Sequence, residues 1–258
     1  MDPYRVVTGW AAEGWGVYGA RFVAGWRYWP GEVGLLVCHQ GPVPGMRLPP
    51  GAGAVDILEV PEYAAFFERH GADPVACGRE RRPGCHWKPQ AAARGYNFRF
   101  DAVKWARQVF AIVHGALGAP ARRTFWIDGD VETFAPVPLG VLDGLLPGPP
   151  AEALAKAGGV YTAYFGRRNY HPDIGVLGFR GDHGDHARFM AAWRELYLSG
   201  RVFGLEEWHS AWTFDHVRRE LGVPGHDYNA RGGRGACTDS VLGAFMVHHK
   251  GQRKLEIA

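Results

Sequence analysis

Short apolar runs alternate with segments of helical periodicity along most of this 258-residue chain. The runs of strand length lie at residues 5–8, 34–39, 55–60, 125–127, 159–165 and 174–179. The helical patterns lie at about 18–29, 61–67, 101–117, 141–146, 183–198 and 206–221. Such alternation is typical of α/β proteins, in which helices cover both faces of a sheet. We therefore expect one α/β domain with a mixed, mostly parallel sheet, a polar turn at 167–173, and loops at 72–98 and 222–239.

Composition narrows the class of protein. A net charge of +3 is too small to favour nucleic acid as the main partner. No apolar run is long enough to predict a transmembrane segment, and the N-terminus lacks the pattern of a signal peptide. The four scattered cysteines suit a reducing compartment, so we expect a cytoplasmic protein. Cys77, Cys85 and His86 could form part of a zinc site, although no fourth ligand is evident.

The apolar run Phe125-Trp126-Ile127 stops abruptly at Asp128-Gly129-Asp130. A glycine between two acids indicates a sharp turn after a short buried strand. The two carboxylates would then lie at the carboxyl edge of the sheet, where open α/β sheets bind ligands. Neighbouring carboxylates stay ionised best with a cation between them, and a hard divalent ion is the natural candidate. The alternative is a polar turn without a ligand.

A strong amphipathic helix precedes this strand. Asp101 is a suitable N-cap, and Gly118 and Pro120 end the helical pattern. The spacing predicts one buried face made of Val103, Ala106, Val109, Phe110 and Val113. Because the strand follows directly, we expect the helix to pack beside it and its first turn to approach the same ligand region.

The pattern His248-x-x-Gly251-x-x-Lys254 is the second informative feature. An imidazole can complete a metal site built mainly from carboxylates. Glycine lets backbone N–H groups approach an anion, and lysine neutralises phosphate. A solvated basic tail is the alternative interpretation.

Gly14-x-Gly16-x-x-Gly19 formally matches a dinucleotide-binding fingerprint. Residues 9–13 are expected to separate these glycines from the first strand, whereas the fingerprint lies at the strand-to-helix turn. The second strand ends in His39-Gln40, without an acid for a ribose. Both observations argue against a dinucleotide site.

In order and content, these features resemble the nucleotide-sugar-dependent glycosyltransferases of the GT-A fold, and most closely the retaining, family 8-like group of glycogenin-like and lipopolysaccharide galactosyltransferase-like enzymes. The resemblance covers most of the chain except 72–98, and it rests on Val6-Val7-Thr8, Tyr18-Gly19-Ala20, Phe100-Asp101-Ala102-x-Lys104, Trp126-Ile127-Asp128-Gly129-Asp130, Asp173-x-Gly175-Val176 and His248-x-x-Gly251-x-x-Lys254. It implies a single Rossmann-like GT-A domain over residues 1–258. The nucleotide-binding part would occupy about 1–135, the acceptor part about 136–240, and the metal and diphosphate tail 241–258.

The resemblance also implies residue roles. Asp128, Asp130 and His248 would hold Mn²⁺ or Mg²⁺, which bridges the two phosphates of the donor. The remaining donor-binding residues would be Thr8 and Tyr18 near the base, Asp101 and Lys104 near the ribose or sugar, and Gly251 and Lys254 at the diphosphate. Asp173 and Gly175 would line the sugar and acceptor side.

An acidic residue is expected close to the reacting sugar. Glu207 is the first choice, with Glu206 next, and Asp173 is the second catalytic candidate. The implied enzyme is a retaining hexosyltransferase that uses a nucleoside-diphosphate sugar, a UDP-sugar, and a glycan or small-molecule acceptor. The alternatives are a nucleotidyltransferase or metal-dependent phosphohydrolase, and a non-catalytic nucleotide-sugar-binding module. The sugar, the acceptor, the stereochemical course and the oligomeric state stay open.

Overall fold

The computed structural model describes residues 2–85, 87–118, 121–147, 161–168, 170–229 and 237–250. Within them a seven-stranded sheet has the order β3-β2-β1-β4-β7-β6-β8. Its strands are β1 (Asp2–Ala11), β2 (Val33–Gln40), β3 (Gly53–Asp56), β4 (Ala121–Ile127), β6 (Thr162–Arg167), β7 (Tyr170–Arg180) and β8 (Gly225–Asp227). Only the two pairings made by β7, with β4 and with β6, are antiparallel among these strands. The prediction of a mixed, mostly parallel sheet is confirmed.

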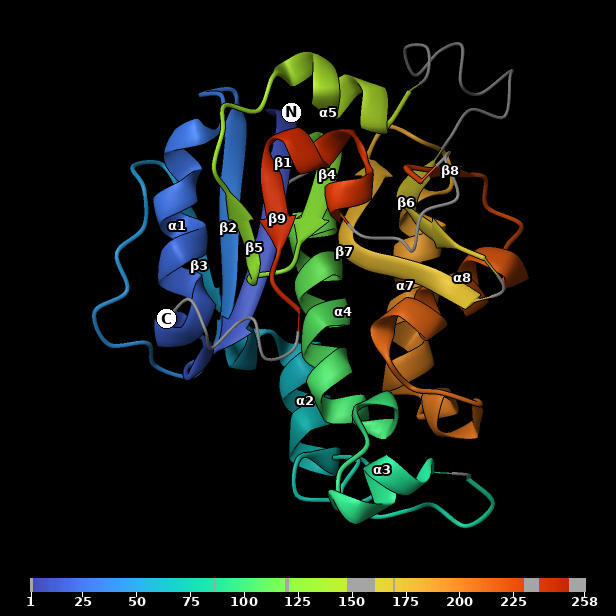
Figure 1. Cartoon of the computed structure of the whole chain (residues 1–258). Coiled ribbons are helices and arrows are strands. Elements are labelled where there is room, and N and C mark those ends of the chain that lie inside the picture. The colour runs from blue at the N-terminus through green and yellow to red at the C-terminus, as the bar shows by residue number, and fades with distance from the viewer. Residues whose placement is uncertain are drawn as a thin grey trace.

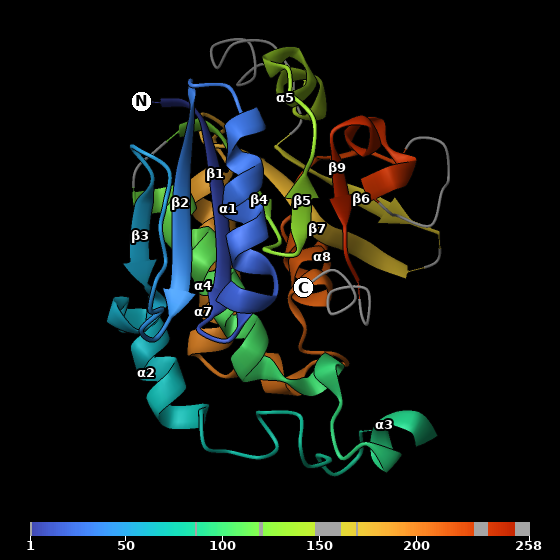
Figure 2. The ribbon, with the colours of Figure 1, turned by 60° about the vertical axis from the view of Figure 1, so that its left-hand side comes forward.

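Helices cover both faces of this sheet, as the alternation predicts (Figure 1). One face packs against α2 (Pro61–His70), α4 (Ala102–Gly118), α7 (His186–Leu198) and α8 (Ser210–Glu220). The other packs against α1 (Ala20–Gly25) and α5 (Leu139–Leu145), and Figure 2 shows α1 on the opposite side of β1 from α4 and α7. The short α3 (Pro89–Ala93) lies in the segment 72–98 that the sequence predicts as a loop.

The side chains of consecutive residues in the central strands pack into the two apolar cores on opposite faces of the sheet. In β4, Phe125 and Ile127 join the α1 side, while Trp126 joins the α4 side. Burial on both faces explains why the sequence of β4 ends in a continuous apolar run instead of alternating with polar residues. The strand ends at Ile127, and the next residue, Asp128, belongs to neither apolar core.

Helix α4 follows the sequence prediction closely. The Lys104 N–H donates to Asp101 Oδ1 at 2.9 Å, which is the expected cap. All five residues of the predicted apolar face are buried. Since α4 leads directly into β4, its first turn lies at the carboxyl edge of the sheet, on the side where Asp128 leaves β4.

Four local predictions are wrong. The strand predicted at 55–60 ends at Asp56, whose carboxylate accepts the Leu58 N–H and starts a 3₁₀ turn. The turn predicted at 167–173 is largely strand, because β7 begins at Tyr170. The loop predicted at 222–239 contains β8, which pairs with β6. Finally, β1 reaches Ala11, so the glycines at 14, 16 and 19 do follow a strand; they enter a π-helical turn, Trp15–Gly19.

In the described part of the chain, no helix has both the length and the apolar character needed to cross a bilayer.

Candidate active site

The turn Asp128-Gly129-Asp130 leaves the centre of the sheet, because β4 lies between β1 and β7. The Asp128 N–H donates to Gly175 O of β7 at 2.8 Å, and the Val131 N–H donates back to Asp128 O at 2.9 Å. The first bond ties the turn to β7, and the second closes the turn itself. Both carboxylates are therefore held by backbone on a rigid part of the sheet.

A small second sheet brings the C-terminal region to this turn. It consists of β5 (Val131–Thr133) and β9 (Met246–His248), which pair antiparallel with Val131 opposite His248. The His249 N–H donates to Asp130 O at 3.0 Å, and the His249 ring lies 3.0 Å from Glu132 Oε2. The pairing register thus sets His248 beside the acid that immediately precedes β5.

His248 and the two acids form a compact group. The His248 Nε2 atom is 3.0 Å from Asp130 Oδ1 and 3.6 Å from Asp128 Oδ2. One ligand atom from each residue lies within 4.8 Å of the others, close enough for all three to hold one metal ion. Two carboxylates and one imidazole suit Mn²⁺ and are acceptable to Mg²⁺. The three residues predicted as metal ligands are brought together.

The charge of Asp128 is poorly compensated by the protein itself. Loss of water around the carboxylate, and secondly the charge of Asp130, raise the pKa of Asp128 to about 6. A bound cation would remove this strain between the two carboxylates. The donor set therefore fits a divalent ion on its charge as well as on its spacing.

Two side chains hold Asp128 in place. The Trp126 Nε1–H and the Gln108 Nε2–H donate to Asp128 Oδ1 at 2.7 and 2.9 Å. The Ser210 hydroxyl donates in turn to Gln108 Oε1 at 2.5 Å, from the first turn of α8. Because these bonds occupy Oδ1, Oδ2 is left facing His248.

Gly175 makes room for the imidazole. A Cβ added at this position would lie 2.4 Å from His248 Cε1 and 2.6 Å from His248 Nδ1, far inside van der Waals contact. The His248 ring therefore lies directly against Gly175 of β7, in space that any side chain would fill. The sequence places Gly175 on the sugar and acceptor side, whereas here it supports a predicted metal ligand.

Asp173 is buried and fully engaged. Its Oδ1 accepts the Gly175 N–H at 2.9 Å, while Oδ2 accepts Arg167 at 2.6 Å and also Lys250. Burial acts to raise the pKa of Asp173, but the charges of Lys250 and Arg167 outweigh burial and lower it. Asp173 thus holds Lys250, two residues after His248. Both carboxylate oxygens of Asp173 already accept hydrogen bonds.

Glu207 lies in a second cluster, before α8. Its Oε1 accepts Arg99 at 2.5 Å, and its Oε2 is 2.7 Å from His209 Nε2. His209 also caps α8 through Nδ1, which accepts the Trp212 N–H, so Nε2 carries the proton that is donated to Glu207. Burial acts to raise the pKa of Glu207, but His209 and Arg99 lower it, and the carboxylate is ionised at neutral pH. Glu206, the second choice, is exposed.

His171 completes this second cluster, at 4.3 Å between its ring centroid and that of His209. Burial, and secondly His209, lower the pKa of His171 to about 3, so its ring is neutral. His171, Glu207 and His209 are also close enough together to hold a cation. However, Arg99 already neutralises the only carboxylate of this group.

The predicted donor-binding residues are distributed around two adjoining hollows. A small one of about 120 Å³ is lined by Tyr18, Lys104 and both acids, and a larger one of about 580 Å³ is lined by Asp101. Lys104 and Arg107 line both. The Tyr18 ring touches the acid turn, since a Cβ on Gly129 would be 3.0 Å from it.

One predicted donor contact, Thr8, is not brought to these hollows: it is fully buried within β1 and lines neither of them. Two others, Gly251 and Lys254, lie outside the described residues.

Several residues of the site are missed by the sequence argument: Trp126 and Gln108 as partners of Asp128, and Arg99, Arg167, His209, Ser210 and Lys250 as partners of the other groups. A polar Gln108 among the otherwise apolar buried residues of α4 is the one sequence signal that could have been used.

No family model matches the sequence, and no curated protein matches it significantly. A glycosyltransferase involved in the glycosylation of the major capsid of PBCV-1 has a similar structure, with a TM-score of 0.50 and 11% sequence identity over 99% of this chain and 98% of that one. The apo form of mouse xyloside xylosyltransferase 1 gives a TM-score of 0.48 and 9% identity over 88% of this chain and 85% of that one. At 11% identity, the similarity to the PBCV-1 capsid glycosyltransferase establishes only the fold. This fold is a single mixed α/β domain of the GT-A-like type.

Proposed function

We propose that this protein is a metal-dependent glycosyltransferase that transfers a sugar from a nucleoside-diphosphate sugar, specifically a UDP-sugar, to a glycan or glycoconjugate. The observation that carries the proposal is the group Asp128, Asp130 and His248, whose ligand atoms lie within 4.8 Å of one another at the carboxyl edge of a GT-A-like sheet. The similar fold of the PBCV-1 capsid glycosyltransferase supports it. When bound, Mn²⁺ or Mg²⁺ would neutralise negative charge on the departing diphosphate.

The remaining chemistry is that of group transfer. The bond between the anomeric carbon and the β-phosphate oxygen breaks, and its electron pair leaves with the diphosphate. An acceptor hydroxyl oxygen forms the new bond to that carbon, and its proton passes to the released diphosphate. Lys104 and Arg107, which line both hollows beside the acids, supply positive charge for the phosphates.

Glu207 remains our candidate for the acid that acts on the sugar. As an ionised carboxylate it can stabilise positive charge that develops on the sugar ring in the transition state. We propose that the anomeric configuration of the sugar is retained. NMR of the anomeric proton in the first product formed tests this stereochemical course. Glu207→Gln should lower kcat and leave the UDP affinity unchanged.

Calorimetry with UDP and MnCl₂ tests the proposal directly. We expect UDP binding that requires Mn²⁺, that is lost in Asp130→Ala, and that is kept in the exposed-acid control Asp239→Ala. Metal-independent binding, or undiminished binding in Asp130→Ala, would contradict the proposed site. A thermal-shift screen of nucleotide sugars with Mn²⁺ then identifies the donor, since a bound ligand raises the apparent stability.

The products separate the alternative functions. Turnover of a plain nucleoside triphosphate without a sugar would favour a nucleotidyltransferase or phosphohydrolase. Binding without any transfer or donor hydrolysis would favour a non-catalytic module.

A further inference from the structure

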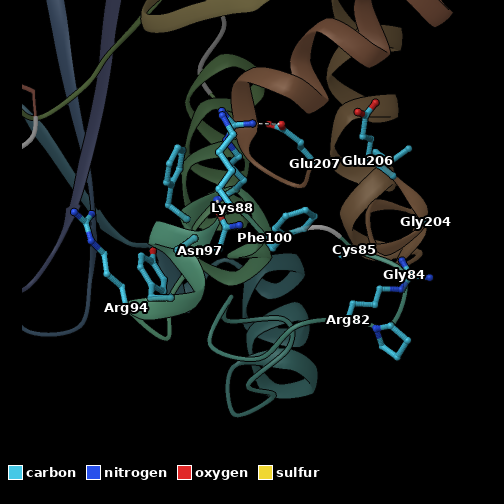
Figure 3. A pocket seen from close by; sticks show the side chains of 16 residues that line it. Arg82, Gly84, Cys85, Lys88, Arg94, Asn97, Phe100, Gly204, Glu206 and Glu207 are labelled. Atoms are coloured by element: carbon cyan, nitrogen blue, oxygen red, sulfur yellow. Dashed lines mark hydrogen bonds and ion pairs between the residues drawn. The ribbon is translucent and has the colours of Figure 1, made fainter.

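A large cavity in the described part of the chain lies outside the acid and histidine site. It encloses about 900 Å³ between the segment that runs from Arg82 to Phe100 and the loop from Gly204 to Glu207 (Figure 3). This volume is in the range of small-molecule sites. The segment 72–98 that supplies most of the lining is the one that the family resemblance leaves unmatched.

The cavity is electropositive. Four basic side chains line it, Arg82, Lys88, Arg94 and Arg99, against only two acidic ones, Glu206 and Glu207. Arg99 and Glu207 neutralise each other at 2.5 Å, as the dashed line in Figure 3 shows. Among the described residues the other three basic side chains form no ion pair. Net positive charge is therefore available to a ligand.

An aromatic wall separates this cavity from the hollow at Asp128. Phe98 lines the cavity and is 48% exposed, while Trp105 lines the hollow. The two rings meet edge to face at 6.4 Å between centroids, and both pack against His209, at 6.2 and 6.0 Å. A ligand in the cavity would thus be separated by these two rings from the hollow that contains the two acids.

Glu207 connects the two spaces chemically. It lines the cavity and accepts from His209, and the next residue, Ser210, donates to Gln108, which holds Asp128. A molecule that fills the cavity therefore lies beside the predicted catalytic carboxylate, which belongs to the cavity lining.

We infer that this cavity is the acceptor site and that it selects a negatively charged saccharide, one that carries a phosphate or a carboxylate. The inference rests on the proposed glycosyltransferase function. The basic side chains bind the anionic group by charge-assisted hydrogen bonds. The exposed faces of Phe98 and Tyr96 suit the apolar face of a sugar ring. The acceptor hydroxyl would then lie beside Glu207, next to the aromatic wall that adjoins the hollow at the two acids.

Cys85 offers a probe inside the cavity, because its thiol is partly exposed and lines the same wall as Gly84 and Arg82. Maleimide labelling of Cys85, followed by peptide mass spectrometry, measures how far a ligand shields it. Cys77, which is also partly exposed but lines the separate hollow at Asp101, serves as the internal reference.

The probes are glucose 6-phosphate, glucuronic acid, glucose and inorganic phosphate at equal concentration. We expect at least one anionic sugar to slow Cys85 labelling about fivefold or more, with glucose and inorganic phosphate slowing it less than about twofold, since neither combines both kinds of contact. The stronger of the two anionic sugars identifies the anionic group. Lys88→Glu and Arg82→Glu should each weaken this protection about tenfold. Arg47→Glu, an equal charge change at an exposed site elsewhere, should not.

Equal protection by glucose or by inorganic phosphate overturns the inference, and so does protection that survives Lys88→Glu and Arg82→Glu together. Binding of UDP with Mn²⁺, measured on the same samples, reports the donor site separately. Its absence from the unmodified protein overturns the proposed function. Intact UDP binding without protection of Cys85 by either anionic sugar overturns the acceptor cavity alone.

Discussion

Gly175→Ala is the sharpest test of how the proposed metal ligands are held. The new Cβ would lie 2.4 Å from His248 Cε1, where ordinary contact begins at 3.4 Å, so the ring must move by about 1 Å. The nearest atom outside His248 would be Asp173 Oδ1, at 3.2 Å from the new Cβ, and it needs to shift only slightly. Metal–ligand distances tolerate only about 0.2 Å. The substitution therefore displaces His248 as a ligand and leaves the sheet intact.

Loss of support for one ligand typically lowers metal affinity 10- to 100-fold, or about 1.4–2.8 kcal/mol. We expect a loss of this size for Mn²⁺, measured by calorimetry in the presence of UDP, with an unchanged melting temperature. Gly34→Ala is the matched control, because it also adds a methyl group to a strand glycine of the same sheet but meets nothing closer than 3.8 Å.

A double-mutant cycle separates this mechanism from general damage. Once His248→Ala has removed the ring, Gly175→Ala has nothing left to displace, and its further effect on Mn²⁺ affinity should fall within about 0.5 kcal/mol of zero. If Gly175→Ala binds Mn²⁺ normally, or if the two changes add in full, the ring does not depend on the space over Gly175 and the argument is refuted.

Three further predictions concern the groups around this site. Gln108→Leu removes one of the two hydrogen bonds to Asp128 and should lower Mn²⁺ affinity about tenfold; an unchanged calorimetric titration would show that Trp126 alone orients the carboxylate. Because burial, and secondly Asp130, raise the pKa of Asp128 to about 6, the proton competes with the metal below that pH, and Mn²⁺ affinity should fall about fivefold from pH 6 to pH 5 and level off above pH 7; a flat profile over this range would show that Asp128 does not have the raised pKa. The lowered pKa of Asp173 means that its charge stabilises the fold above the unfolded value of 3.8, and that this contribution is lost as the pH falls through the lowered pKa. Asp173→Asn should therefore cost about 1–3 kcal/mol in urea unfolding at pH 7, because Arg167 and Lys250 are partly exposed, and its difference from the unmodified protein should narrow at about pH 3.

The local sequence pattern was sufficient to predict features that depend on a single helix or strand. The buried face of α4 and its Asp101 cap follow from spacing alone, because the helix lies against one core along its whole length. The end of β4 before Asp128 follows for a similar reason: its last residues alternate between two apolar cores, and the apolar run stops at Asp128. The meeting of the acids with His248 needed the family resemblance, since their proximity depends on β9, a three-residue strand with no signal of its own.

Partners that depend on tertiary packing could not be read from the sequence. The sequence predicts Glu207 as an acid near the reacting sugar but gives no sign of its partner His209, which caps α8 and donates to Glu207. Asp173 looked like a turn residue open to an acceptor, but β7 starts at Tyr170 and encloses it between Arg167 and Lys250. In both cases the decisive contact comes from a residue whose side chain could equally have faced solvent.

The pairing of β5 with β9 also fixes the order in which the site is completed during protein synthesis. Asp130 and His248 are separated by 118 positions, so at 5–20 residues per second the imidazole is made roughly 6–24 s after the acids. During that interval Asp128 and Asp130 are present without the third proposed ligand. A chain interrupted before Met246 can still contain the whole seven-stranded sheet, yet it lacks the imidazole of the proposed metal site. Donor binding would therefore distinguish chains translated through β9 from shorter products of the same message.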